Sequence, residues 1–170
     1  MRLLVLDAIL LLGFLSGLAH HAGPPLPEGA RADRVVIEKR ERRLTLLRKG
    51  RVLKRYRVVL GPHPEGPKMR AGDGRTPEGT YRIDWRNRRS RSFLALHISY
   101  PDRVDRERAR ILAARPGGDI MIHGLPNGRG WLGRFYQLFY RTEGCISVTN
   151  AEMREIWRAV PDGTVVEIRP

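Results

Sequence analysis

Cysteine and aromatic residues are scarce in this 170-residue sequence, which has one cysteine and only 7% aromatic residues. A single thiol cannot form a disulfide within the chain, and it excludes zinc modules built from paired cysteines. The few aromatic residues form no stacking signature of an RNA-binding module, and no recognition-helix pattern is present. Cys145 is therefore a buried filler residue, a link to another chain, a metal ligand or a nucleophile.

Acidic residues are also scarce, with 18 Asp and Glu against 32 Lys and Arg, for a net charge of +14. Such a charge attracts anionic partners in a salt-dependent way without naming them. Because no nucleic-acid motif accompanies the charge, we expect no nucleic-acid partner.

A long apolar run occurs only at the N-terminus, where residues 3–19 are apolar except for Asp7 and Ser16. Residues 1–22 predict a signal peptide or a membrane anchor, and hence an exported protein of the periplasm or cell envelope. Residues 23–33 are rich in proline and glycine and predict a linker. The remaining residues, 34–170, suit one domain.

Alternating and β-branched runs within this domain predict a mainly β fold with two helices, arranged as an antiparallel sandwich or barrel. The expected strands are residues 34–38, 44–47, 52–60, 80–85, 93–98, 120–123 and 165–168. The expected helices are residues 102–114 and 149–160, the second opening on a capping box between Thr149 and Glu152. The glycine- and proline-rich stretch 61–74 and the basic stretch 86–91 are expected to be loops.

The most informative pattern pairs Cys145 with His123, which ends the apolar strand at residues 120–123. A thiol needs a base to become a good nucleophile near neutral pH, and an imidazole can supply one. Gly144 leaves the backbone beside the sulfur unobstructed, so the amides of Gly144 and Cys145 could face a developing oxyanion. These residues predict acyl transfer through a thioester.

Four ordered segments resemble the L,D-transpeptidase catalytic domain of the YkuD type. They are Ile122-His123-Gly124, Thr142-Glu143-Gly144-Cys145-Ile146, Arg75-Thr76-Pro77-Glu78-Gly79-Thr80-Tyr81 and Gly163-Thr164-Val165-Val166-Glu167-Ile168. Two positions depart from that family's pattern, because Glu143 stands where a second histidine is usual and Ser147 where an arginine often follows.

This resemblance implies a cysteine acyltransferase that acts on peptidoglycan stem peptides in cell-wall biogenesis. Cys145 would attack a diaminopimelate carbonyl with His123 as base, and the Gly124 carbonyl would orient the imidazole. The acyl acceptor stays open: an amine gives cross-linking, a lipoprotein lysine gives anchoring to an outer-membrane lipoprotein, and water gives an L,D-carboxypeptidase or murein hydrolase. No cofactor is implied.

Other residues are weaker candidates. His97, Tyr100, Arg141 and Trp131 could contact the substrate, as could Arg134, because guanidinium groups bind carboxylates. A zinc site built from His63, His97, His123 and Cys145 is a further alternative, although it lacks short ligand spacing. The aromatic insert at residues 125–141 is expected either to cover the thiol or simply to plug the domain. A non-catalytic basic wall-binding module remains the alternative from another class.

Overall fold

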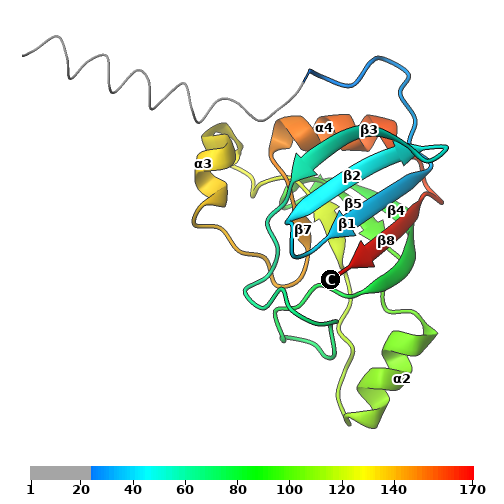
Figure 1. The fold of residues 1–170 in the computed structure, drawn as a ribbon. Coiled ribbons are helices and arrows are strands. Elements are labelled where there is room, and N and C mark those ends of the chain that lie inside the picture. The colour runs from blue at the N-terminus through cyan, green and yellow to red at the C-terminus, as the bar shows by residue number, and fades with distance from the viewer. Residues whose placement is uncertain (1–23) are drawn as a thin grey trace, which may run out of the picture.

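A computed structural model describes residues 24–170 of the chain, so the N-terminal signal or anchor predicted at residues 1–22 lies outside the described residues. Eight strands form one sheet in the order β3-β2-β1-β8-β4-β5-β6-β7 (Figure 1). The strands are β1 (Arg34–Glu38), β2 (Arg43–Arg48), β3 (Arg51–Arg57), β4 (Gly79–Ser90), β5 (Phe93–Ile98), β6 (Met121–His123), β7 (Ile146–Ser147) and β8 (Val165–Arg169). The helices are α2 (Arg103–Ile111), α3 (Gly133–Gln137) and α4 (Asn150–Ala159), with a 3-10 turn η1 (Gly130–Leu132).

The prediction of a mainly β fold is confirmed, and the structure adds detail that the sequence did not reveal. Two strand pairs, β1 with β8 and β6 with β7, are parallel, so the sheet is mixed. A third helix, α3, lies in the insert between His123 and Cys145. The sheet is not closed into a barrel, although backbone hydrogen bonds between Val59 and Ser147 join the chain beyond β3 to β7.

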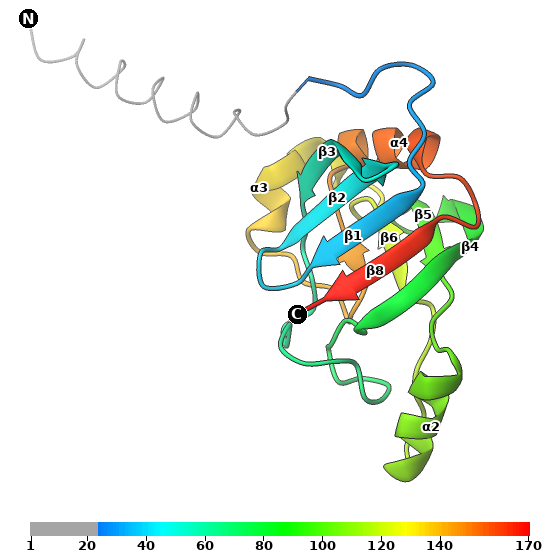
Figure 2. The same cartoon turned by 45° about the vertical axis from the view of Figure 1, so that its right-hand side comes forward.

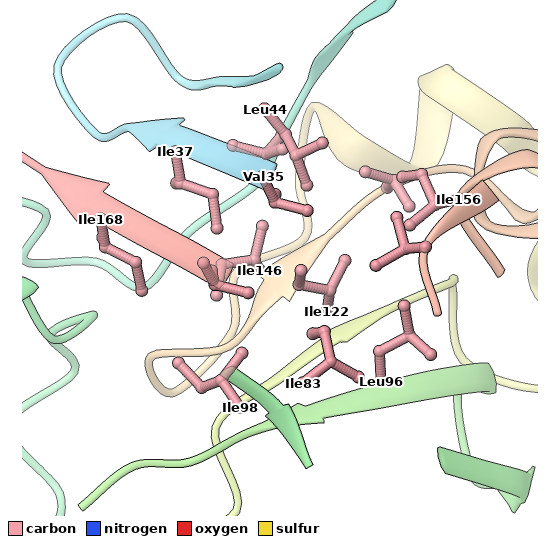
Figure 3. Packing of buried hydrophobic residues seen from close by; sticks show 14 of the residues in the cluster. Val35, Ile37, Leu44, Ile83, Leu96, Ile98, Ile122, Ile146, Ile156 and Ile168 are labelled. Carbon is pink, nitrogen blue, oxygen red and sulfur yellow. The ribbon is translucent and has the colours of Figure 1, made fainter. Parts of the chain in front are cut away.

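The sheet curls around one hydrophobic core. Side chains from β1 and β8 approach those from β5, β6 and β7, as the labelled residues Val35, Ile168, Leu96, Ile122 and Ile146 show (Figure 3). Ile156 of α4 closes the core from one side. This helix begins as predicted, with a reciprocal capping box between Thr149 and Glu152.

Two local predictions are wrong. Residues 86–91 were expected to form a loop, yet β4 continues to Ser90. Charged residues fit this strand because the Arg86 guanidinium donates to the Trp157 carbonyl and pairs with Asp162. The strand expected at residues 52–60 ends at Arg57, because Val58 and Val59 then bond to Arg42 and Ser147.

Helix α2 projects away from the sheet in both views (Figures 1 and 2). It buries Asp105 and Ala109, and Tyr81 donates a 3.0 Å hydrogen bond to the Asp105 carboxylate. Residues 24–33, assigned to a linker, run back along α4, where the Ala32 amide donates to the Ala159 carbonyl at 2.7 Å. No helix among the described residues is long and apolar enough to cross a membrane.

Candidate active site

The β6–β7 seam, which we define as residues 121–124 and 142–147, brings the two predicted catalytic residues to one face of the sheet. Ile122 lies opposite Ile146, and both point into the core. Side chains alternate along a strand, so His123 and Ser147 point to the other face, and we expect the same of Cys145, which directly precedes β7. One step back along both strands places Cys145 level with Met121. His123 and Cys145 are thus diagonal neighbours, about 5 Å apart across the strands and about 7 Å along them.

The orientation of His123 is fixed by its own backbone neighbour. Its Nδ1 lies 2.6 Å from the Gly124 carbonyl oxygen. Because a carbonyl oxygen can only accept, Nδ1 carries the proton and Nε2 is unprotonated in the neutral ring. The ring is 7% exposed, and burial lowers the pKa of His123 below its ordinary value. Near neutral pH the residue is therefore a neutral base whose accepting atom is Nε2.

The thiol of Cys145 rests in its neutral form. Burial raises the pKa of Cys145, while the Met121 amide and the charge of Lys68 act in the opposite direction. Its Sγ donates to the Asp119 carbonyl oxygen at 3.4 Å. Because the thiol and the imidazole are both neutral, attack on a carbonyl would need proton transfer, so the pair suits general-base catalysis rather than a preformed thiolate.

The turn before the sulfur is held by Thr142, a residue whose role the sequence did not reveal. Its hydroxyl donates to the Cys145 carbonyl at 2.7 Å and accepts from the Gly144 amide at 3.3 Å. The Gly144 amide proposed for an oxyanion is therefore bonded to Thr142 in this state. Gly144 has a φ of 124°, and a Cβ there would lie 2.4 Å from the Arg75 carbonyl oxygen. Only glycine fits both constraints.

A second missed residue, Asn150, supports the segment that follows His123. Its Oδ1 accepts from the Leu125 amide at 2.8 Å. A Cβ on Gly124 would lie 2.7 Å from the same oxygen, so the amide side chain fills the space beside the glycine. The only sequence signal was its place beside the Thr149 capping box.

His97 lies on the same face as the pair, because it is opposite Met121 in the β5–β6 register. Its Nδ1 is 2.6 Å from the Asp84 carboxylate, and its ring stacks on Trp85 at 4.9 Å between centroids. Its Nε2 is 4.0 Å from the carboxylate of Asp119, whose carbonyl holds the thiol. The sequence-predicted His97 is thus brought to the site's edge.

The other weak candidates lie elsewhere. Tyr100 is buried in the core and donates to the Pro116 carbonyl at 2.7 Å. Trp131 is 82% exposed on η1, and Arg141 bonds to the Tyr140 carbonyl. Arg134 pairs with Glu152. Among residues 24–170, no group of three or more His, Cys, Asp or Glu side chains is placed to hold a metal, so the zinc alternative gains no support.

Comparison with known proteins identifies the family of the chain. The family model of the YkuD L,D-transpeptidase catalytic domain matches residues 32–168. No functionally curated protein matches the chain.

Among solved structures, the helical cell shape determining protein Pgp2 of Campylobacter jejuni is 20% identical, with a TM-score of 0.61, covering 92% of this chain and 54% of Pgp2. An L,D-transpeptidase of Xylanimonas cellulosilytica is 19% identical (TM-score 0.52; 92% and 69% covered). L,D-transpeptidase 1 of Mycobacterium tuberculosis is 15% identical (TM-score 0.50; 81% and 60% covered). The chain spans about half the length of Pgp2, and these likenesses concern the fold. The family match, which covers most of the sequence, shows that this chain belongs to the L,D-transpeptidase catalytic domain family.

Proposed function

We propose that the protein is a cysteine acyltransferase of the cell wall that forms a thioester between Cys145 and a peptidoglycan stem peptide. The observation that supports this proposal is the parallel pairing of β6 with β7, which sets His123 opposite Ser147, two residues after Cys145. From this register we expect the two side chains on one face of the seam. The membership of the chain in its family supplies the substrate class.

In the acylation step, the Cys145 thiol gives its proton to Nε2 of His123 as Sγ attacks the peptide carbonyl. A carbon–sulfur bond forms, and the carbonyl oxygen takes the negative charge. The tetrahedral intermediate then collapses, the carbon–nitrogen bond breaks, and the leaving amine takes the proton back from Nε2. The acyl group remains on sulfur as a thioester, and His123 is again neutral.

The oxyanion needs donors, and the seam contains two candidates. The amide of Cys145 follows the turn, and the Gly144 amide bonds only to the Thr142 hydroxyl at 3.3 Å. A hydrogen bond of this length is weak, so a charged oxygen could compete for the amide. Thr142 would then hold the turn through its shorter bond to the Cys145 carbonyl.

Deacylation by an amine would give transpeptidation, and deacylation by water would give a carboxypeptidase or hydrolase. Glu143, an exposed carboxylate directly before Gly144, contributes to the raised pKa of Cys145 and so places negative charge near the sulfur. A protonated acceptor amine would be attracted to this charge. We therefore favour an amine acceptor, such as the lysine of an outer-membrane lipoprotein, and place the protein in the envelope or periplasm.

Incubation of the full chain with disaccharide tetrapeptide, with and without a D-amino acid acceptor, tests the proposal by mass spectrometry of products. We expect exchange of the terminal residue, and we expect a carbapenem to add one equivalent of mass to the protein. Because Cys145 is the only cysteine, the adduct reports on this residue alone. Cys145→Ala should remove both signals. Unchanged tetrapeptide and no adduct would contradict the proposal, and release of the terminal residue without exchange would assign the hydrolase.

A further inference from the structure

A strongly basic cavity of about 750 Å³ lies at the outer edge of β3, and Val59 in its lining is bonded to Ser147 of the seam. We call it the arginine cavity. It is lined by seven arginines and one acidic residue, Glu41, together with Tyr56, Val58, Val59, Gln137 and Leu138. The arginines are Arg40, Arg42, Arg43, Arg55, Arg57, Arg134 and Arg141. The turn between β1 and β2, strand β3 and helix α3 contribute these residues.

Most of this positive charge is not neutralised by the protein. Three of the seven arginines have a partner, since Arg43 pairs with Glu38, Arg134 with Glu152, and Arg141 with backbone carbonyls. Within residues 24–170, the guanidinium groups of the other four make no ion pair or hydrogen bond; these are Arg40, Arg42, Arg55 and Arg57. Arg57 also lies directly opposite Arg43 in the β2–β3 register. Like charges placed opposite one another destabilise a sheet, and an anion would relieve this cost.

Gln137 is a further polar residue in the wall of the cavity. The residue is 8% exposed and lines the cavity, yet its Nε2 has no hydrogen-bond partner. A buried amide donor without a partner is costly, and such groups in native proteins often mark the place of a missing partner. Its Nε2 has almost no accessible surface, however, so a ligand in the arginine cavity would reach it only after the side chain turned.

The chemistry of the lining limits the class of ligand. Guanidinium groups bind carboxylates and phosphates through paired hydrogen bonds. The only aromatic residue of the lining, Tyr56, is 2% exposed and donates to Glu155, so it offers no face on which a base could stack. This argues against a nucleic acid.

We propose that the arginine cavity binds a flexible polyanionic chain through successive carboxylate or phosphate groups. The floor of the cavity runs into the seam, because Val59 exchanges two backbone hydrogen bonds with Ser147, two residues after Cys145. A chain bound here would lie beside the catalytic face. The proposal does not depend on the reaction that Cys145 performs.

Binding of fluorescein-labelled hexaglutamate and of labelled linear polyphosphate to the full chain, followed by anisotropy at low and high salt, tests this. We expect at least one probe to bind, with an affinity that falls as salt rises. Arg40→Glu/Arg57→Glu should weaken binding about tenfold or more, because two attractive contacts become repulsive.

The matched control is Arg103→Glu/Arg106→Glu, which makes the same change of net charge on the projecting helix α2 (Figure 2). It should change the dissociation constant less than twofold, and thermal melts should show that all variants fold. Tighter binding of hexaglutamate would show that the ligand carries carboxylates, and tighter binding of polyphosphate that it carries phosphates. A labelled DNA duplex is measured in the same way. The proposal is overturned if neither anionic probe binds, if both double variants lose affinity equally, or if only the DNA duplex binds.

Discussion

The β6–β7 seam and the arginine cavity meet at Val59, yet their polar side chains differ in whether they have hydrogen-bond partners within the protein. In the seam, Nδ1 of His123, the Thr142 hydroxyl and the Cys145 thiol each donate to a named backbone carbonyl. In the cavity, four guanidinium groups and the Gln137 amide have no such partner among residues 24–170. The seam is thus organised before a substrate arrives, whereas the cavity carries charge that a ligand would have to complete.

This difference predicts that changes in the seam should affect the rate of acylation, while changes in the cavity should affect binding of anions. The largest effect is expected for His123→Gln. It removes the base while keeping a polar side chain of similar reach, and it should slow acylation by a carbapenem about 10²- to 10⁴-fold. The rate of adduct formation, measured by intact-protein mass, checks this.

His63→Gln is the matched control, because His63 is an exposed histidine in the loop before β4. It should leave the rate unchanged. Equal rates for His123→Gln and the unmodified chain would mean that the thiol reacts without this imidazole. Binding of hexaglutamate should be unchanged in both variants, which would show that anion binding in the cavity does not depend on the histidine of the seam.

The contrast also explains how much the sequence could reveal. The two segments of the seam, His123-Gly124 and Gly144-Cys145, could be singled out because each is a short run of neighbouring residues. The capping box of Thr149 and the strands around the core followed from local patterns in the same way and are confirmed. The catalytic roles of Cys145 and His123 remain predictions.

The features that could not be predicted depend on contacts between distant parts of the chain. The charged stretch after Trp85 continues as strand because its backbone pairs with β5, and the Arg86 side chain is held to α4, 71 residues later, through the Trp157 carbonyl. The parallel pairing of β1 with β8 joins the two ends of the domain. The arginine cavity gathers residues from three elements, and individual arginines in a basic chain give no sign of such clustering.

A second test of the seam is Gly144→Ala. A methyl group here would meet the Arg75 carbonyl oxygen and would also have to tolerate a φ of 124°. We expect the turn to shift, with a loss of acylation rate of about 10- to 100-fold, the scale of a small misplacement of a catalytic group. Gly50→Ala is the control, because Gly50 has a φ of 76° but nothing within 4 Å of the added methyl. It should reduce the melting temperature slightly and leave the rate intact.

The loop that supports Gly144 gives a smaller, pH-dependent effect. Burial favours a raised pKa for Asp73, but hydrogen bonds from Lys68, Met69, Arg70 and Arg75 outweigh it and lower the pKa to about 2. A lowered folded-state pKa stabilises the fold above the unfolded value of 3.8, and this contribution is lost as pH falls towards 2.

Asp73→Asn should therefore destabilise the protein by about 2 kcal/mol at pH 6 and by little near pH 2. Urea unfolding at several pH values measures this difference. Glu65→Gln, a change at an exposed carboxylate in the same loop, should have no comparable effect. A destabilisation by Asp73→Asn that stays constant down to pH 2 would exclude the ionic explanation.

The smallest effect is expected for Ser147→Ala, which separates the two donors that share the Gly124 carbonyl. The Ser147 hydroxyl lies 3.3 Å from this oxygen and Nδ1 of His123 lies 2.6 Å from it. Burial lowers the pKa of His123, and the bond from Nδ1 to Gly124 raises it by a smaller amount. Removal of the competing hydroxyl should strengthen the bond and raise the pKa of His123. Acylation needs neutral His123, so its rate rises with pH through a midpoint below the ordinary value of 6.5. The midpoint of the rate–pH profile of Ser147→Ala should lie at slightly higher pH than that of the unmodified chain, with the same rate on the plateau. A midpoint at lower pH would show that the hydroxyl assists the imidazole rather than competing with it.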